Sequence, residues 1–138
     1  PNIPTRVIQR MAAGTGKRVR ETIAGNISTP KTILMKSARD RDTNVAYNVA
    51  CNPNVPREAL TILAERRNIG ILVAVVRNKN TPEEALAKLA RNNNRNLRLL
   101  IAEHENTSRE TLEFLLLKAV KEADQKLAET VRLALAKQ

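Results

Sequence analysis

Aromatic residues are nearly absent from this sequence. Its 138 residues include one tyrosine, one phenylalanine and no tryptophan, although 42% of the chain is hydrophobic. A core of this composition must be built from leucine, isoleucine, valine and alanine, which suits small, closely packed helices. The shortage of aromatics argues against an aromatic-lined ligand pocket and against base stacking on single-stranded nucleic acid. The length predicts a single domain, residues 1–138.

Cysteine and histidine are equally scarce. Cys51 and His104 are each the only residue of their type and lie 53 positions apart. A lone cysteine cannot form an internal disulfide, and this pair does not provide the ligand set of a metal site. We therefore expect no metal and no cofactor. We interpret His104 as a helix-end residue and Cys51 as partly exposed.

Long apolar runs and a secretion signal are also missing. The longest candidate, Ile69–Val76, has eight residues including Gly70, far fewer than the roughly 18 that a membrane-spanning helix needs. No charged segment followed by an apolar run opens the chain, as it would in a signal peptide. These absences predict a soluble, cytoplasmic protein with no membrane association.

What the sequence does contain is a 26-residue repeat. The start of each unit is marked by Pro4, Pro30, Pro56, Pro82 and Ser108. Four residues later an apolar residue returns as Ile8, Leu34, Leu60, Leu86 and Leu112. Later in each unit another returns as Val19, Val45, Ile71, Leu97 and Ala123. This spacing predicts five units, approximately residues 1–25, 26–51, 52–77, 78–103 and 104–138.

The apolar spacing within each unit predicts two short helices. Neither helix can bury its apolar stripe alone, so the units are expected to stack into an all-α solenoid with a continuous core. Ile69–Val76 is rich in β-branched residues and alone would suit a strand, but its place in the repeat predicts a helix. The last unit carries six basic and six acidic residues, and we expect it to cap the stack.

Helix boundaries can be assigned from the turn residues. Each proline is expected at the first helical position, with the preceding threonine as cap. Glutamates in two units would complete a capping box. The threonines are Thr29, Thr81 and Thr107, and the glutamates are Glu84 and Glu110. Asn26, Asn52 and Asn78 are expected to end the second helices in the left-handed conformation. Asn54, Asn80 and Asn106 recur too regularly to be a polar site and indicate turns.

The sequence resembles a known repeat family. Asn52-Pro53-Asn54-Val55-Pro56, followed by Leu60, Leu63-Ala64 and Val75-Val76, is similar to the leucine-rich repeat variant pattern of bacterial proteins, and residues 78–102 repeat it. The resemblance implies a right-handed superhelix of alternating helices, akin to HEAT and armadillo arrays, with helices partly of the 3₁₀ type. The period here is longer than the family's usual one. The iron–sulfur cysteine cluster of one such protein has no counterpart near Cys51.

Basic residues outnumber acidic residues by 24 to 14, and the excess lies in the first four units. The basic residues gather at the turn between the two helices of each unit, where stacking would align them into a basic edge. The predicted basic edge comprises Lys17, Arg18, Arg20, Arg39, Arg41, Arg66, Arg67, Arg91, Arg95 and Arg98. Acidic residues gather at the start of the first helix, on the opposite edge. This distribution either complements the helix dipoles, binds phosphates or docks an acidic protein surface.

A second candidate surface is apolar. Leu72, Val73, Leu99 and Leu100 lie off the core stripe of their helices. They either line an inner groove of the superhelix or form an exposed patch for a partner or a second copy.

These features favour a non-enzymatic scaffold that binds an acidic macromolecule through the basic edge or the inner groove. The alternative is sequence-nonspecific binding of duplex DNA or structured RNA through phosphates. A third reading, an enzyme like the HEAT-like alkylpurine DNA glycosylases, lacks tryptophans and an evident catalytic acid. We expect a protein or nucleic-acid partner and no small-molecule substrate, and the sequence does not determine the oligomeric state.

Overall fold

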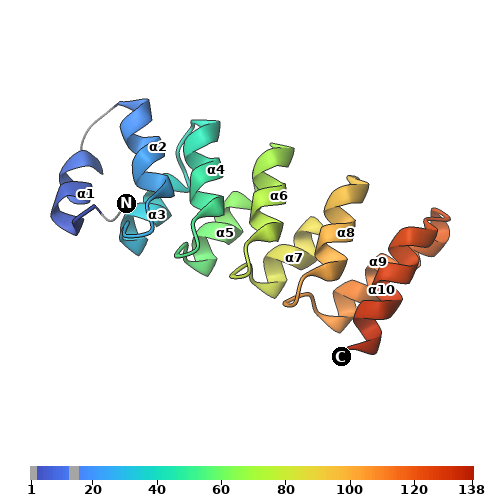
Figure 1. The fold of residues 1–138 in the computed structure, drawn as a ribbon. Helices are drawn as coiled ribbons and strands as arrows, with labels where there is room; N and C mark the ends of the chain where they lie inside the picture. Colours follow the sequence, from blue (N-terminus) through green and yellow to red (C-terminus); the bar gives the residue numbers. More distant parts are fainter. Residues whose placement is uncertain (1–2, 13–15) are drawn as a thin grey trace.

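The computed structural model describes residues 3–12 and 16–138, and every regular element in these residues is a helix (Figure 1). The helices are α1 (Thr5–Ala12), α2 (Lys17–Gly25), α3 (Lys31–Ser37), α4 (Thr43–Cys51), α5 (Arg57–Leu63), α6 (Ile69–Arg77), α7 (Glu83–Leu89), α8 (Arg95–Glu103), α9 (Arg109–Lys121) and α10 (Gln125–Ala136). The predicted all-α class is confirmed. The β-branched segment Ile69–Val76 lies in α6, as its position in the repeat predicted.

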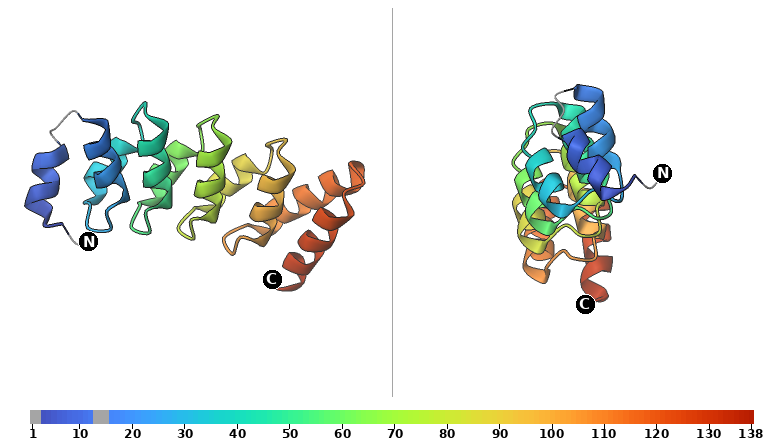
Figure 2. Two further views of the ribbon diagram at one scale, coloured as in Figure 1. Left: turned by 45° about the horizontal axis from the view of Figure 1, so that its top comes forward. Right: turned by 90° about the vertical axis from the view of Figure 1, so that its left-hand side faces the viewer.

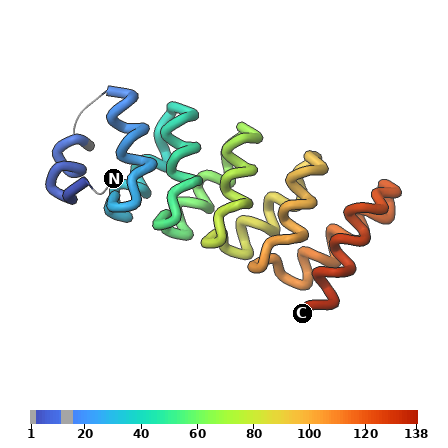
Figure 3. The backbone as a smooth tube through the Cα atoms, in the orientation of Figure 1, coloured from blue at the N-terminus to red at the C-terminus, as the bar shows by residue number. Residues whose placement is uncertain are grey.

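Consecutive helices pair, and the pairs stand in a row (Figures 1 and 2). The even-numbered helices form one layer, in which α2, α4, α6, α8 and α10 each pack on the next. The odd-numbered helices form a second layer, where α5 contacts both α3 and α7. From α3 onward the links within pairs lie along the upper edge in Figure 3, and the links between pairs lie along the lower edge. Equivalent turns therefore meet along one edge.

The core is aliphatic, as the composition predicted. One contiguous group of buried side chains extends from Ala24 to Val131. Each pair contributes a leucine or isoleucine from its odd-numbered helix, and these are Ile8, Leu34, Leu60, Leu86 and Leu112. Buried alanines such as Ala50 and Ala102 keep the even-numbered helices close to their neighbours, because a methyl group occupies little volume.

The odd-numbered helices begin differently from the prediction. Pro30, Pro56 and Pro82 occupy the N-cap position, one residue before the helix, and no side chain caps α3, α5 or α7. Thr29, Thr81 and Thr107 are buried, and each hydroxyl donates a hydrogen bond of 2.5–2.6 Å to a carbonyl of the preceding helix, those of Ile23, Val75 and Ile101. The predicted capping boxes are therefore wrong, because the threonines are engaged by the previous helix. Ser108, which replaces the proline, caps α9 by accepting from the backbone N–H of Thr111.

Asparagines at the ends of the even-numbered helices join each pair to the one before. The Asn52 side chain is buried, and its Nδ2 donates to two backbone carbonyls of the preceding pair, including that of Asn26 at 3.0 Å. Asn78 makes the same two bonds, one of them to the carbonyl of Asn52 at 3.1 Å. His104 replaces asparagine in α8, with Nε2 3.0 Å from the carbonyl oxygen of Asn78. We call Asn26, Asn52, Asn78 and His104 the Asn ladder.

The ladder residues end their helices in extended rather than left-handed backbone. Asn52, for example, has φ −72° and ψ 122°. Its Oδ1 accepts the backbone N–H of Asn54 at 2.9 Å, and this side-chain turn redirects the chain without a positive φ. The Nδ1 of His104 accepts the N–H of Asn106 in the same way, so its Nε2 is the donor to Asn78. The predicted left-handed ends are therefore wrong, and His104 is a helix-end residue.

A second row of amides runs beside the ladder. Nδ2 of Asn54, Asn80 and Asn106 donates to a backbone carbonyl of the preceding link, at 2.5 Å, 2.8 Å and 3.0 Å respectively. The prediction that these asparagines serve the turns holds, but their bonds connect one turn to the next rather than staying within a turn.

The last pair departs from the 26-residue spacing. Asn94 caps α8 by accepting the N–H of Leu97, and Asp124 caps α10 by accepting that of Leu127, although Asn94 and Asp124 are 30 residues apart in the sequence. The difference arises because α9 has 13 residues where α7 has seven. Ala123, predicted as a core position, instead lies exposed in the turn with φ 55°.

Replacing a ladder amide should destabilise the fold. Asn52→Ala leaves two buried carbonyls without their donor and one N–H without its acceptor, so we expect a loss of at least about 2 kcal/mol in the free energy of unfolding. Urea denaturation followed by circular dichroism measures this. Asn96→Ala, at an exposed position of α8, is the control and should change stability by less than roughly 0.5 kcal/mol. Equal effects of the two substitutions would show that the ladder does not hold the pairs together.

Candidate functional site

The predicted basic-edge residues lie in the links within pairs and in the first turns of α2 and α8. Arg39 and Arg41 belong to the α3–α4 link, and Arg66 and Arg67 to the α5–α6 link. Successive links are in contact, because Nη2 of Arg66 donates to the carbonyl of Ala38 at 3.1 Å and to that of Asp40. Stacking therefore brings these turns together, but it also engages the Arg66 guanidinium in hydrogen bonds to the preceding link.

Acidic residues of the α3–α4 link neutralise bases of the preceding even-numbered helix, α2. Arg20 pairs with Asp40 at 2.7 Å, and Lys17 pairs with Asp42 at 3.1 Å. Burial raises the pKa of Asp40, but the Arg20 guanidinium and the backbone N–H of Asp42 together hold that pKa below its ordinary value. The sequence interpretation assigned acids to the opposite edge and missed these carboxylates. The alternation of arginine and aspartate in Arg39-Asp40-Arg41-Asp42 is the sequence feature that could have indicated these ion pairs.

The same pairing recurs at the C-terminal end. Arg95 binds Asp124 at 2.6 Å, and Arg98 binds Glu122 at 2.7 Å. Arg98 is only 4% exposed and also donates to the carbonyl of Asn93, while its buried Nε has no hydrogen-bond partner in the described part of the chain. Arg98 is therefore a structural residue, and its assignment to a binding edge is wrong.

Four arginines of the predicted edge remain available. Arg18, Arg39, Arg41 and Arg67 are exposed, and none has an ion-pair partner among residues 3–12 and 16–138. We call these four residues the arginine row. Arg91 is also exposed, with its guanidinium carbon 6.0 Å from the centre of the Phe114 ring. The exposed, unpaired arginines of the predicted edge therefore lie mainly in the N-terminal half of the chain.

The predicted apolar patch is mostly part of the interior. Leu72 is buried, and Val73, Leu99 and Leu100 are partly buried against the core. Of the two alternatives, the exposed patch is wrong for Leu72, which lies in the core. Of the four residues, Val73 lines a groove.

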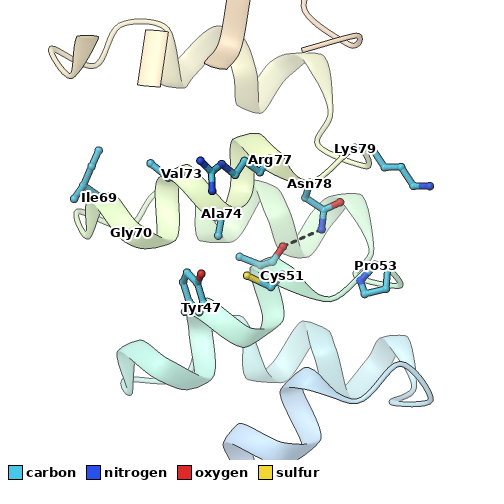
Figure 4. Close-up of a pocket in the computed structure, with 11 residues that line it drawn as sticks. Tyr47, Cys51, Pro53, Ile69, Gly70, Val73, Ala74, Arg77, Asn78 and Lys79 are labelled. Carbon is cyan, nitrogen blue, oxygen red and sulfur yellow. Dashed lines mark hydrogen bonds between the residues drawn. The ribbon is translucent and has the colours of Figure 1, made fainter. Parts of the chain in front are cut away.

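This groove lies between α4 and α6 and has a volume of about 550 Å³ (Figure 4). Its walls include Tyr47, Ala50 and Cys51 from α4 and Ile69, Val73 and Ala74 from α6. Figure 4 shows Tyr47 and Cys51 facing Ala74 across the groove, and the hydrogen bond from the Asn78 amide to the carbonyl of Ala50 joins its two walls. The sequence interpretation missed this site, although Tyr47, Val73 and Leu99 share one position of the repeat.

The groove combines an apolar wall with positive charge at its rim. Arg77 and Lys79 line it and are exposed, and no ion pair engages either of them within the described ranges. Tyr47 is 45% exposed, and the neighbouring Cys51 thiol raises the pKa of its phenol above the ordinary value. Tyr47 therefore offers the groove both a ring face and a hydroxyl group. Cys51 is exposed, as expected.

Neither a metal cluster nor a membrane span is found in the part of the chain that the structure describes. No group of three or more histidine, cysteine, aspartate or glutamate residues is arranged to hold an ion. No helix there combines the length and the apolar character that a bilayer crossing requires.

Acid should weaken the link between α8 and the last pair. The hydrogen bond from Arg95, followed by that from the N–H of Leu127, holds the pKa of Asp124 below its ordinary value of 3.8. A carboxyl with a depressed folded-state pKa stabilises the fold above its unfolded-state pKa and ceases to do so as pH falls through the folded value. Urea titrations from about pH 5 to about pH 2 should therefore show a steeper loss of stability in wild type than in Asp124→Asn. Parallel losses would contradict this role.

Comparison with known proteins assigns no relative to this chain: no family model, no curated protein and no solved structure matches it. Its function is therefore inferred from its own surfaces.

Proposed function

We propose that the protein is a non-enzymatic scaffold, a right-handed solenoid of five two-helix repeats similar to the leucine-rich repeat variant family, that binds an acidic protein partner. The row of helix pairs and the 26-residue spacing of α3, α5, α7 and α9 support the repeat architecture. The groove between α4 and α6 is the observation that carries the proposed role. Ligand sites between helices of a repeat array typically use the surface that stacking creates.

The groove favours a peptide segment of one chemical type. Its apolar wall suits an aliphatic or aromatic side chain, and burying one such side chain contributes about 1.5–3 kcal/mol. Arg77 and Lys79 at the rim suit an aspartate or glutamate beside that side chain. Exposed charge pairs add less than about 1 kcal/mol each, so we expect affinities in the micromolar range or weaker for a single segment. Tyr47 and Arg77 are residue types that often dominate such interfaces.

Selection from a displayed peptide library tests this proposal. Enriched peptides should contain an apolar residue next to an acidic one. Arg77→Glu should weaken binding of a selected, fluorescently labelled peptide at least about tenfold, as measured by anisotropy, because it reverses the charge at the rim. The control Arg57→Glu changes net charge equally at an exposed position of α5 and should leave binding unchanged. Enriched peptides without acidic residues, or equal binding to both variants, would contradict the proposal.

A second candidate function, phosphate binding, rests on the arginine row. These four exposed arginines lie at the start of α2 and in the α3–α4 and α5–α6 links, and guanidinium groups bind phosphate oxygens in a bidentate manner. A duplex or structured RNA held in this way would be recognised by its backbone and not by its sequence. The ion pairs at Lys17, Arg20, Arg95 and Arg98 reduce the charge available, which is why this function ranks second.

A salt series distinguishes this alternative. If all four arginines contact phosphates, the logarithm of the affinity for duplex DNA should fall against log salt with a slope of about −3.6. Changing the arginine row to glutamate should abolish binding. The matched control reverses four exposed bases at the starts of odd-numbered helices, namely Arg6, Lys31, Arg57 and Arg109, and should retain most of the affinity. No binding at low salt, or equal loss in both variants, would exclude the arginine row as a phosphate site.

A further inference from the structure

A hollow between α8 and α10 repeats the position of the α4–α6 groove two helix pairs further along the row. It has a volume of about 490 Å³, and we call it the α8–α10 hollow. Ala102 and Glu103 of α8 line it, and the residues two 26-residue periods earlier, Ala50 and Cys51 of α4, line the groove. Both cavities therefore arise where one even-numbered helix packs on the next.

The opposite walls of the two cavities are also equivalent. Asn68 caps α6 and Asp124 caps α10, so Arg77 and Leu133 occupy the same position, nine residues after the cap. Each of the two lines its own cavity. Leu133 is 66% exposed, so the α8–α10 hollow presents an apolar side chain where the groove presents a guanidinium.

The charge at the ends of the even-numbered helices changes sign from one pair to the next. Arg77 and Lys79 lie at the end of α6 and just after it, and Glu103 and Glu105 hold the equivalent positions of α8. All four side chains are exposed, and no ion pair engages any of them in the two described stretches of the chain. A basic pair of residues is thus followed by an acidic pair, and both are free to contact a partner.

The basic and acidic pairs lie on adjacent links. Nδ2 of Asn106 donates to the carbonyl of Lys79 at 3.0 Å, and Nε2 of His104 lies 3.0 Å from the carbonyl oxygen of Asn78. These bonds hold the link after α8 directly against the link after α6. Packed helices lie about 8–10 Å apart, which roughly three residues of extended chain span.

We propose that one extended segment of the partner crosses from the α4–α6 groove to the α8–α10 hollow and places a lysine or arginine beside Glu103 and Glu105. This inference rests on the proposed function and deepens it, because it specifies a second contact for the same segment. An apolar residue of the segment occupies the groove, and an acidic residue meets Arg77 and Lys79. The basic residue follows at a spacing of roughly three residues.

The α8–α10 hollow suits a basic side chain in both its wall and its rim. Ala102 and Leu112 form a buried apolar wall, and Leu133 continues it outward. Lysine and arginine lay their methylene stems along apolar surface and keep the charged group near water. Two exposed carboxylates lie among the lining residues, and Lys137 contributes only one opposing charge.

The change of sign disfavours other occupants of this face. Like charges placed across an interface oppose binding. A nucleic-acid backbone or a uniformly acidic segment would meet Glu103 and Glu105, and a uniformly basic segment would meet Arg77 and Lys79. A segment that carries both signs in the matching order complements both links.

Peptides selected from a displayed random library on the wild-type protein are the probe for this inference. Enriched peptides should carry a lysine or arginine about three residues from their acidic residue, in either chain direction. Replacing that basic residue by glutamate in one labelled peptide should weaken binding to wild type at least about fivefold in anisotropy titrations. The altered peptide should regain its affinity on the variant Glu103→Lys with Glu105→Lys, because the reversed rim attracts it.

The matched control is Glu65→Lys with Glu129→Lys. It changes net charge equally at two exposed positions that line neither cavity. This control should prefer the original peptide over the altered one, as wild type does. The circular dichroism spectrum should be unchanged in both variants, since all four replaced side chains are exposed.

The outcomes separate this inference from the proposed function. If Arg77→Glu weakens binding but enriched peptides lack a basic residue at this spacing, the inference is wrong and the proposed function stands. The same conclusion follows if the altered peptide binds the Glu103→Lys, Glu105→Lys variant no better than it binds wild type. If Arg77→Glu has no effect, or if the library yields no binder, both are wrong.

Discussion

The architecture depends on hydrogen bonds that cross from one helix pair to the next. Helices of seven to nine residues are too short to be stable alone, and their ends leave carbonyl groups without partners. The Asn ladder supplies those partners from the neighbouring pair, through Asn52 and Asn78 and through His104. The buried threonines satisfy further carbonyls of the preceding helix. At the C-terminal ends of the even-numbered helices, the hydrogen bonds that satisfy free carbonyls are thus the same ones that join the pairs.

The stacking of helix pairs determines which charged residues form ion pairs. Because each turn lies against the previous one, a base at the start of an even-numbered helix meets an acid one repeat later, as in Arg20 with Asp40 and Arg95 with Asp124. A large part of the positive charge along this edge therefore holds the pairs together. The surfaces left for partners include the α4–α6 groove and the arginine row.

These two surfaces occupy different parts of the row. The groove lies in the even-numbered layer, and the arginine row follows the edge formed by the links within pairs. Two weak sites on one protein bind a bivalent partner more tightly than either site alone.

The sequence by itself determined the all-α class, the helix pairs, the helical state of Ile69–Val76 and the identity of most core residues, because helical periodicity and a repeated spacing are local signals. It did not determine the partners of polar groups. Thr29, Asn52 and Arg98 carry no local sign of the carbonyls and acids they bind, since those groups come from an adjacent pair. The sequence pattern could not reveal the displacement of α10, because Ala123 in the 26-residue register and Leu127 in the 30-residue register are both apolar. Only the N-cap at Asp124 distinguishes the two registers. Tertiary structure likewise decided which predicted surface residues are buried, because burial depends on how closely neighbouring helices approach.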